Sequence, residues 1–211
     1  MTRSGRFISL EGGEGAGKST QIRLLAERLR HYGLDVLTTR EPGGSPGAEQ
    51  IRKLLVEGEP GRWDAMTEAL LHSAARRDHL RTTVWPALDA GQWVLSDRFA
   101  DSTAAYQGFG HGLHHSELTA LYRLAVGDFR TDLTLILDLP VEEGLRRAAA
   151  RGGAEDRYEK LDRTFHERLR EGFLSIAKAD PGRCLVIDAS GPPEAVQKLI
   201  VAAVFGRFGL Q

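Results

Sequence analysis

Residues 12–19 are the part of this sequence best suited to chemistry. They read GGEGAGKS and match the pattern G-x-x-x-x-G-K-[ST]. Glycines let the backbone curl until successive N–H groups point at phosphate oxygens, and a helix behind them adds its positive end. Lys18 can then reach the β- and γ-phosphates, while the Ser19 hydroxyl can ligate Mg²⁺. The segment predicts a nucleoside triphosphate site, with contacts from Gly12, Gly13, Glu14, Gly15, Ala16, Gly17, Lys18, Ser19 and Thr20.

Two carboxylates follow apolar runs and are candidates to hold the metal. Asp97 comes directly after residues 93–96, and Asp138 lies within residues 135–139. Asp97 is followed at once by Arg98, and Arg makes bidentate phosphate contacts that Lys cannot make. This pairing favours Asp97 and a site that holds two phosphate-bearing ligands.

A polar and aromatic run continues from Arg98 as FADSTAAYQG. On a helix, Ser102, Thr103, Tyr106 and Gln107 would share one broad face. A Gln amide and a Tyr ring can read a nucleobase. An ordinary helix start, capped by Asp101 or Ser102, explains the same run equally well.

Apolar segments alternate with helical periodicity along the chain, which is typical of an α/β fold with a parallel sheet. The predicted strands are residues 6–11, 35–39, 93–96, 133–139 and 184–187. A helix is expected behind the glycine-rich loop, another around residues 161–173, and a last one over 193–205. No linker or repeat divides the chain, so we expect one domain over residues 1–211.

The composition excludes several classes of protein. Lys and Arg number 28 against 29 Asp and Glu, so the chain is not a broadly basic nucleic-acid binder. No apolar run approaches the roughly 20 residues that span a bilayer, and no secretory signal is visible. The single cysteine, Cys184, excludes an intrachain disulfide and favours a reducing compartment. We therefore expect a cytoplasmic protein that works without membrane or nucleic acid.

Three uses of a bound nucleotide remain to be compared. A regulatory GTPase needs an Asn-Lys-x-Asp motif, and this chain has no Asn. A partner-binding ATPase needs only the loop and one carboxylate. The additional Arg98 and an Arg-rich later segment favour a phosphoryl transferase.

The sequence resembles the bacterial thymidylate kinases over nearly its whole length. The matching segments are FISLEG before the loop, TREPGG at 39–44, EALL at 68–71, the 97–108 run, and the residues around Asp132 and Asp138. The resemblance implies a three-layer α/β/α P-loop sandwich with a five-stranded parallel sheet. It also implies a homodimer and transfer of the γ-phosphoryl group of Mg-ATP to dTMP.

The resemblance also implies roles for particular residues. Glu14 would face the deoxyribose 3′-hydroxyl, and Tyr106 would pack on the sugar and exclude a 2′-hydroxyl. Arg98 would bind the acceptor phosphate with Arg52 as its neighbour, and Lys18 and Asp97 are further expected catalytic residues. The remaining expected dTMP contacts are Glu41, Pro42, His72, Arg76, Ser102, Thr103 and Gln107. A kinase for another nucleoside monophosphate or a deoxynucleoside is the alternative.

One departure from the family pattern and one difference between subtypes of the family bear on the site. Similar enzymes place Phe or Tyr where this chain has His72, which can stack on the base but is smaller and can titrate near neutral pH. Some relatives carry a catalytic Arg in the loop, where this chain has Gly15. The resemblance to the bacterial subtype of the family implies that a mobile lid, here residues 145–157, supplies it, from Arg151 first and Arg147 second. Gly152 and Gly153 would form the hinge.

Overall fold

A computed structural model describes residues 5–59, 61–151 and 157–210, except for the side chain of Arg151. Five parallel strands form one sheet in the order β2-β3-β1-β4-β5. They are β1 (Phe7–Glu11), β2 (Val36–Arg40), β3 (Trp93–Asp97), β4 (Leu133–Asp138) and β5 (Cys184–Asp188). Every residue of β1 is buried, as expected for a central strand covered on both faces.

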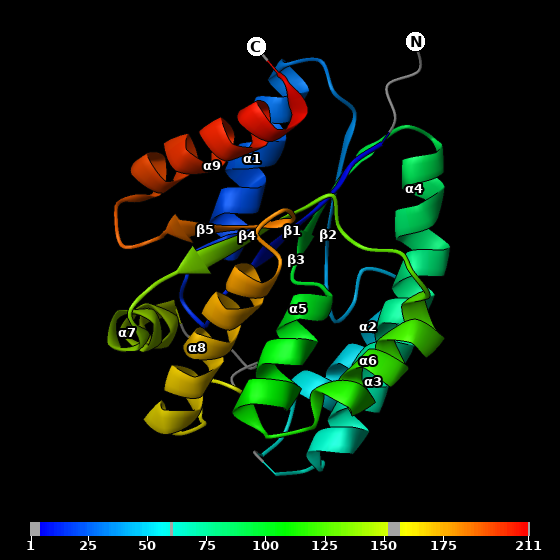
Figure 1. The fold of residues 1–211 in the computed structure, drawn as a ribbon, viewed down its shortest axis with the longest axis vertical. Helices are drawn as coiled ribbons and strands as arrows, with labels where there is room; N and C mark the ends of the chain where they lie inside the picture. Colours follow the sequence, from blue (N-terminus) through cyan, green and yellow to red (C-terminus); the bar gives the residue numbers. More distant parts are fainter. Residues whose placement is uncertain (1–4, 60, 152–156, 211) are drawn as a thin grey trace.

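Helices cover both faces of the sheet, which gives three layers (Figure 1). Leu10 of β1 and Leu95 of β3 pack against α1 and α9 on one face. Phe7 and Val94, which alternate with them, pack against the helices of the other face. The helices are α1 (Lys18–His31), α2 (Pro46–Val56), α3 (Ala65–His79), η1 (Leu80–Val84), α4 (Trp85–Asp89), α5 (Ala100–Thr103), η2 (Ala104–Gly110), α6 (His115–Val126), α7 (Val141–Arg151), α8 (Arg163–Ala179) and α9 (Pro193–Phe208).

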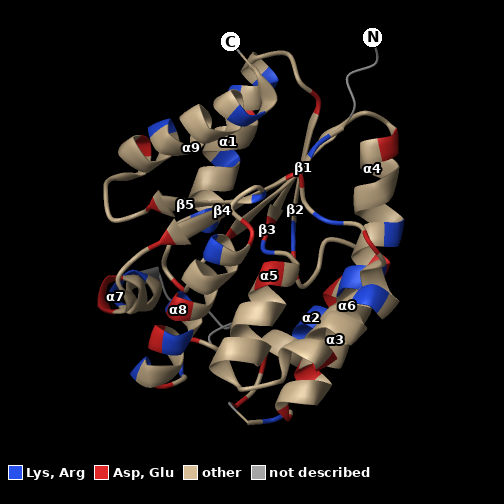
Figure 2. Cartoon of the chain, viewed as in Figure 1, with Lys and Arg blue, Asp and Glu red and all other residues tan. Residues whose placement is uncertain are grey.

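The predicted fold class is confirmed. Each strand end either agrees with the prediction or differs from it by one residue. The last helix extends three residues beyond its predicted end. The predicted lid, residues 145–157, begins within α7, and its residues 152–156 lie outside the described part of the chain. Acidic and basic residues are interspersed over the helices (Figure 2). Within the described residues, no helix is both long and apolar enough to cross a membrane.

The run after Arg98 is not one regular α-helix. α5 is a single turn, and η2 continues it as a π-helix that carries Tyr106 and Gln107. The suggestion that Asp101 or Ser102 caps this helix is wrong, because Phe99 occupies the N-cap position and no side chain caps it. Asp101 instead accepts hydrogen bonds from Arg183, and Ser102 donates to Glu11. π-helical turns are frequent at functional sites.

Candidate active site

A cleft of about 620 Å³ opens at the carboxyl ends of β1 and β3. Ligands of open parallel sheets bind at this edge. The predicted site residues that line it are Glu14, Gly15, Gly17, Lys18, Ser19, Thr20, Glu41, Pro42, Arg52, His72, Asp97, Arg98, Ser102, Thr103, Tyr106 and Gln107. Gly12, Gly13 and Ala16 line a small cavity behind the loop, and Arg76 lies behind the cleft wall.

The phosphate loop connects β1 to α1, and three of its glycines, Gly12, Gly15 and Gly17, have positive φ. Gly15 and Gly17 have φ of 68° and 87°, in the left-handed region that glycine tolerates best. A Cβ on Gly15 would also lie 2.0 Å from the Gly144 carbonyl oxygen of α7. The loop therefore fits closely against α7, with its curl fixed from outside.

Lys18 begins α1 and folds back over the loop. Its Nζ donates to the carbonyl oxygens of Gly12 at 3.1 Å and Gly13 at 2.8 Å. Burial and the nearby Arg98 lower the pKa of Lys18 to about 8. An anionic phosphate beside Lys18 would favour its charged form.

The sequence predicts Ser19 and Asp97 as ligands of a divalent cation, and their side chains are in contact in this structure. The Ser19 hydroxyl donates to Asp97 Oδ2 at 2.6 Å. A hydroxyl and a carboxylate are hard oxygen donors suited to Mg²⁺, which keeps several waters and phosphate oxygens as its other ligands. The alternative carboxylate, Asp138, is instead held by both Arg170 Nε at 2.7 Å and Nη2 at 2.9 Å. The pairing with the loop serine thus favours Asp97.

Arg98 follows β3 and lines the cleft opposite the phosphate loop. Its backbone conformation is strained. Its φ of 70° makes it the only described non-glycine residue with positive φ. Three hydrogen bonds hold this conformation: Arg98 N–H donates to Leu10, Ser96 Oγ donates to the Arg98 carbonyl, and Phe99 N–H donates to Glu11. Such strain persists where surrounding contacts over-determine it.

The Arg98 guanidinium joins the phosphate loop to η2. It donates to the Gly12 carbonyl at 3.0 Å, to Glu14 Oε1 at 2.9 Å and to the Tyr106 hydroxyl at 2.9 Å. Tyr106 in turn donates to Glu14 at 2.5 Å. Burial raises the Glu14 pKa, but Arg98 and Lys18 outweigh it and bring the value down to about 2. Glu14 is therefore an anion that fixes Arg98.

Glu11, at the end of β1, is a positioning group that the sequence reasoning did not name as a site residue. Its side chain is fully buried and accepts hydrogen bonds from Phe99 N–H and the Ser102 hydroxyl. Burial and the neighbouring Asp101 raise its pKa to about 7. A carboxylate at the last position of an apolar strand was the available signal, because such a group needs buried partners.

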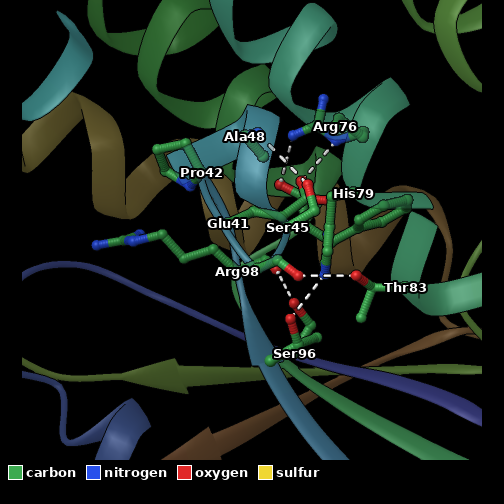
Figure 3. Close-up of polar contacts among 12 residues, drawn as sticks. Glu41, Pro42, Ser45, Ala48, Arg76, His79, Thr83, Ser96 and Arg98 are labelled. Carbon is green, nitrogen blue, oxygen red and sulfur yellow. Dashed lines mark hydrogen bonds and ion pairs between the residues drawn. The ribbon is translucent and has the colours of Figure 1, made fainter. Parts of the chain in front are cut away.

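Arg76 supports the cleft wall from behind, where Glu41 lies between Arg76 and His79 (Figure 3). Arg76 Nε donates to Glu41 Oε2 at 2.7 Å, and its Nη2 donates to Thr103 Oγ1 at 3.0 Å. The neighbouring Pro42 follows a cis peptide bond, and its carbonyl accepts from Arg52 at 2.7 Å. The buried ion pair between Arg76 and Glu41 joins α3 to the segment after β2, and the hydrogen bond to Thr103 joins α3 to α5.

His72 also lines the cleft. Burial and the charges of Arg76 and Arg98 lower its pKa to about 3, so its ring is neutral over the physiological range. His72 Nε2 lies 3.3 Å from the hydroxyl of Tyr158. Tyr158 also lines the cleft and is a second residue that the sequence reasoning missed.

Of the two predicted lid arginines, the structure describes the side-chain contacts of Arg147 alone. Arg147 donates to Glu143 at 2.7 Å and to the carbonyls of Ala189 and Ser190 at 3.2 Å, beyond the end of β5. Its guanidinium is thus engaged away from the residues that line the cleft. The side chain of Arg151 lies outside the described part of the chain.

The parallel sheet has a phosphate loop directly after its central strand β1, and Arg98 lies in the same cleft. This arrangement defines a P-loop nucleotide kinase. A family model described as thymidylate kinase matches residues 10–200. The chain belongs to the thymidylate kinase family.

Individual relatives agree with this assignment. The thymidylate kinase of Caulobacter vibrioides is 57% identical over 206 residues, covering 98% of this chain and 99% of the relative. That of Nitrobacter winogradskyi is 53% identical over 98% of this chain and 90% of the relative. The crystal structure of the Ehrlichia chaffeensis thymidylate kinase is 35% identical, with a TM-score of 0.76 over 95% of this chain and 99% of that one.

Proposed function

We propose that this chain catalyses the reaction of its family, the transfer of the γ-phosphoryl group of ATP to dTMP. The observation that carries the proposal is the contact between Arg98 and the phosphate loop, 3.0 Å from Nη1 to the Gly12 carbonyl. An arginine suited to an acceptor phosphate thereby lies beside the loop suited to the donor phosphates. Two phosphate-bearing substrates can meet in one cleft.

The reaction needs positioning and charge neutralisation more than covalent chemistry. A phosphate oxygen of dTMP attacks the γ-phosphorus while the bond from that phosphorus to the β–γ bridging oxygen breaks, giving dTDP and ADP. Lys18 neutralises charge on the β- and γ-phosphates. Arg98 exchanges part of its contact with Glu14 for a contact with the acceptor phosphate. Arg52 binds the same phosphate.

Ser19 and Asp97 are the residues that would hold Mg²⁺ in this proposal, directly or through water. The ion supplies neutralisation of phosphate charge when bound. The loop residues from Gly12 to Thr20 supply the N–H groups around the phosphates.

Selection of dTMP is assigned to the other end of the cleft. Tyr106 packs on the sugar and excludes a 2′-hydroxyl, while Glu14 faces the 3′-hydroxyl. His72 stacks on the base. The remaining base and wall contacts are assigned to Arg76, Ser102, Thr103, Gln107, Glu41 and Pro42. Arg76 is almost completely buried behind Thr103, so its contribution is support of the wall or contact along the base edge.

The test is a coupled assay of ADP release with Mg-ATP and dTMP, dUMP, UMP, CMP or thymidine as acceptors. We expect strong preference for dTMP. Release only with another acceptor would keep a kinase and overturn the base-reading assignments. Release independent of any acceptor would indicate an ATPase.

We also propose a cytoplasmic homodimer. Leu54 of α2, Leu70 of α3 and Leu124 of α6 are exposed apolar residues on adjoining helices (Figure 1). Exposed apolar side chains on adjoining helices favour burial against a second copy. The single buried cysteine is consistent with a reducing compartment.

A further inference from the structure

Gln107 lines the cleft, and one half of its side-chain amide already has a hydrogen-bond partner. The residue is completely buried on η2, and its Nε2 donates to Glu68 Oε2 at 3.0 Å. Its Oε1 is buried and has no partner among the described residues. A buried acceptor without a partner is costly, so such a group indicates a ligand that donates to it.

Glu68 of α3 determines which half of the amide is free. This carboxylate is 2% exposed and accepts from Arg157, which also donates to the carbonyls of Leu55 and Glu59. Tyr158 donates to the same carboxylate at 3.3 Å, and His111 Nε2 lies 3.8 Å away. A carboxylate held by a guanidinium can only accept, so Gln107 must turn its NH₂ toward Glu68.

We propose that Glu68 is a positioning residue that locks the Gln107 amide with its carbonyl oxygen toward the cleft, so that the site selects pyrimidines with an N3–H donor. This rests on the proposed function. Thymine and uracil both carry that N–H, whereas cytosine carries a bare N3 acceptor that would face Oε1. Two facing acceptors repel, and sites built around a hydrogen bond reject analogues that lack it.

The test compares kcat/KM for dTMP, dUMP and dCMP in the full-length wild type and in Glu68→Gln. The amide that this substitution introduces can accept or donate, so Gln107 is free to turn over and meet cytosine N3. We expect the dTMP/dCMP ratio to fall by about tenfold or more, with the dTMP/dUMP ratio unchanged. General damage to the fold would instead lower all three values together, which would overturn the lock.

A matched control removes another ion-paired carboxylate away from the cleft. Asp132→Asn removes the charge that pairs with Arg6 and should leave both ratios unchanged. Because Glu68→Gln leaves Arg157 buried opposite a neutral group, the double variant Glu68→Gln/Arg157→Gln is a second test that leaves no buried charge. It should show the same selective fall in dTMP/dCMP.

The outcomes separate this inference from the proposed function. A wild type that does not phosphorylate dTMP overturns the proposed function, and the inference with it. An active Glu68→Gln or double variant that keeps the wild-type dTMP/dCMP ratio overturns the inference alone.

Discussion

At the scale of single residues, the surroundings of each titratable group in the cleft set its protonation state. Glu14 stays anionic because Arg98 and Lys18 outweigh its burial, while His72 is kept neutral by burial and by Arg76 and Arg98. The concern that His72 introduces a titration near neutral pH is therefore answered by its surroundings. Its pKa of about 3 leaves an uncharged ring that can stack as Phe or Tyr does.

We expect His72→Phe to keep the KM for dTMP within about threefold, whereas His72→Ala raises it by about tenfold, since only the latter loses the stacking surface. The ratio of KM values for His72→Phe and wild type should be constant between about pH 5 and 8, because the dTMP phosphate titrates equally in both assays. Steady-state kinetics checks both points. A ratio that changes by about tenfold over this range would show that His72 becomes protonated.

At the scale of elements, the phosphate loop is shaped by α7 as much as by its own glycines. A Cβ on Gly144 would lie 2.5 Å from the backbone oxygen of Glu14. Gly144→Ala should therefore displace the loop, raise the KM for ATP by about fivefold or more and destabilise the fold by about 1–3 kcal/mol. Denaturant unfolding and kinetics measure the two effects.

The control for Gly144→Ala is Gly206→Ala, because Gly206 lies within α9 and a Cβ there meets nothing within 4 Å. It should stabilise the protein by about 0.4–1 kcal/mol and leave the KM for ATP unchanged. Equal effects of the two substitutions on ATP would contradict the loop argument.

The lid assignment also belongs to this scale. Arg151→Ala should lower kcat by about tenfold or more with little change in dTMP binding, because an arginine on the transferred phosphoryl group acts in the transition state. Arg146→Ala is the matched control on the same helix, since Arg146 is exposed and pairs only with Glu143 among the described residues. An unchanged kcat in Arg151→Ala would transfer the assignment to Arg147, tested by Arg147→Ala.

At the scale of the whole molecule, Glu11 links stability to pH. Its pKa is about 7 in the folded chain and near 4.5 when unfolded, so between these values the folded state binds more protons. The stability that Glu11 contributes is complete below about pH 4.5 and is lost as pH rises through 7. Relative to Glu11→Gln, the wild type should lose melting temperature between about pH 5 and 8. A constant difference in calorimetry across this range would contradict the shifted pKa.

The proposed dimer gives the second prediction at this scale. Leu124 is 84% exposed, and a charge there should oppose burial against a second copy. Leu124→Glu should shift sedimentation from dimer to monomer, while Val186→Glu, an exposed apolar residue on β5, should not. A wild type that sediments as a monomer would refute the dimer directly.

The sequence by itself determined the phosphate loop, the five strands and the α/β class, because these depend on short-range patterns: glycine spacing, strand-length apolar runs and helical periodicity. The motif around Arg98 and the family resemblance were readable in the same way. Local pattern also predicted Asp97 as the carboxylate beside Ser19.

Only the tertiary structure decided how these pieces act on one another. The strained backbone of Arg98, the π-helical turn under Tyr106 and the partners of Glu11 depend on contacts between segments far apart in the chain. Glu11 and Phe99, for example, are 88 positions apart, and no local pattern encodes their contact. The same holds for Glu68, Arg157 and Gln107, which come from three separate segments. A buried charge needs a partner, but the sequence cannot say which one, because burial and proximity arise only when the layers pack.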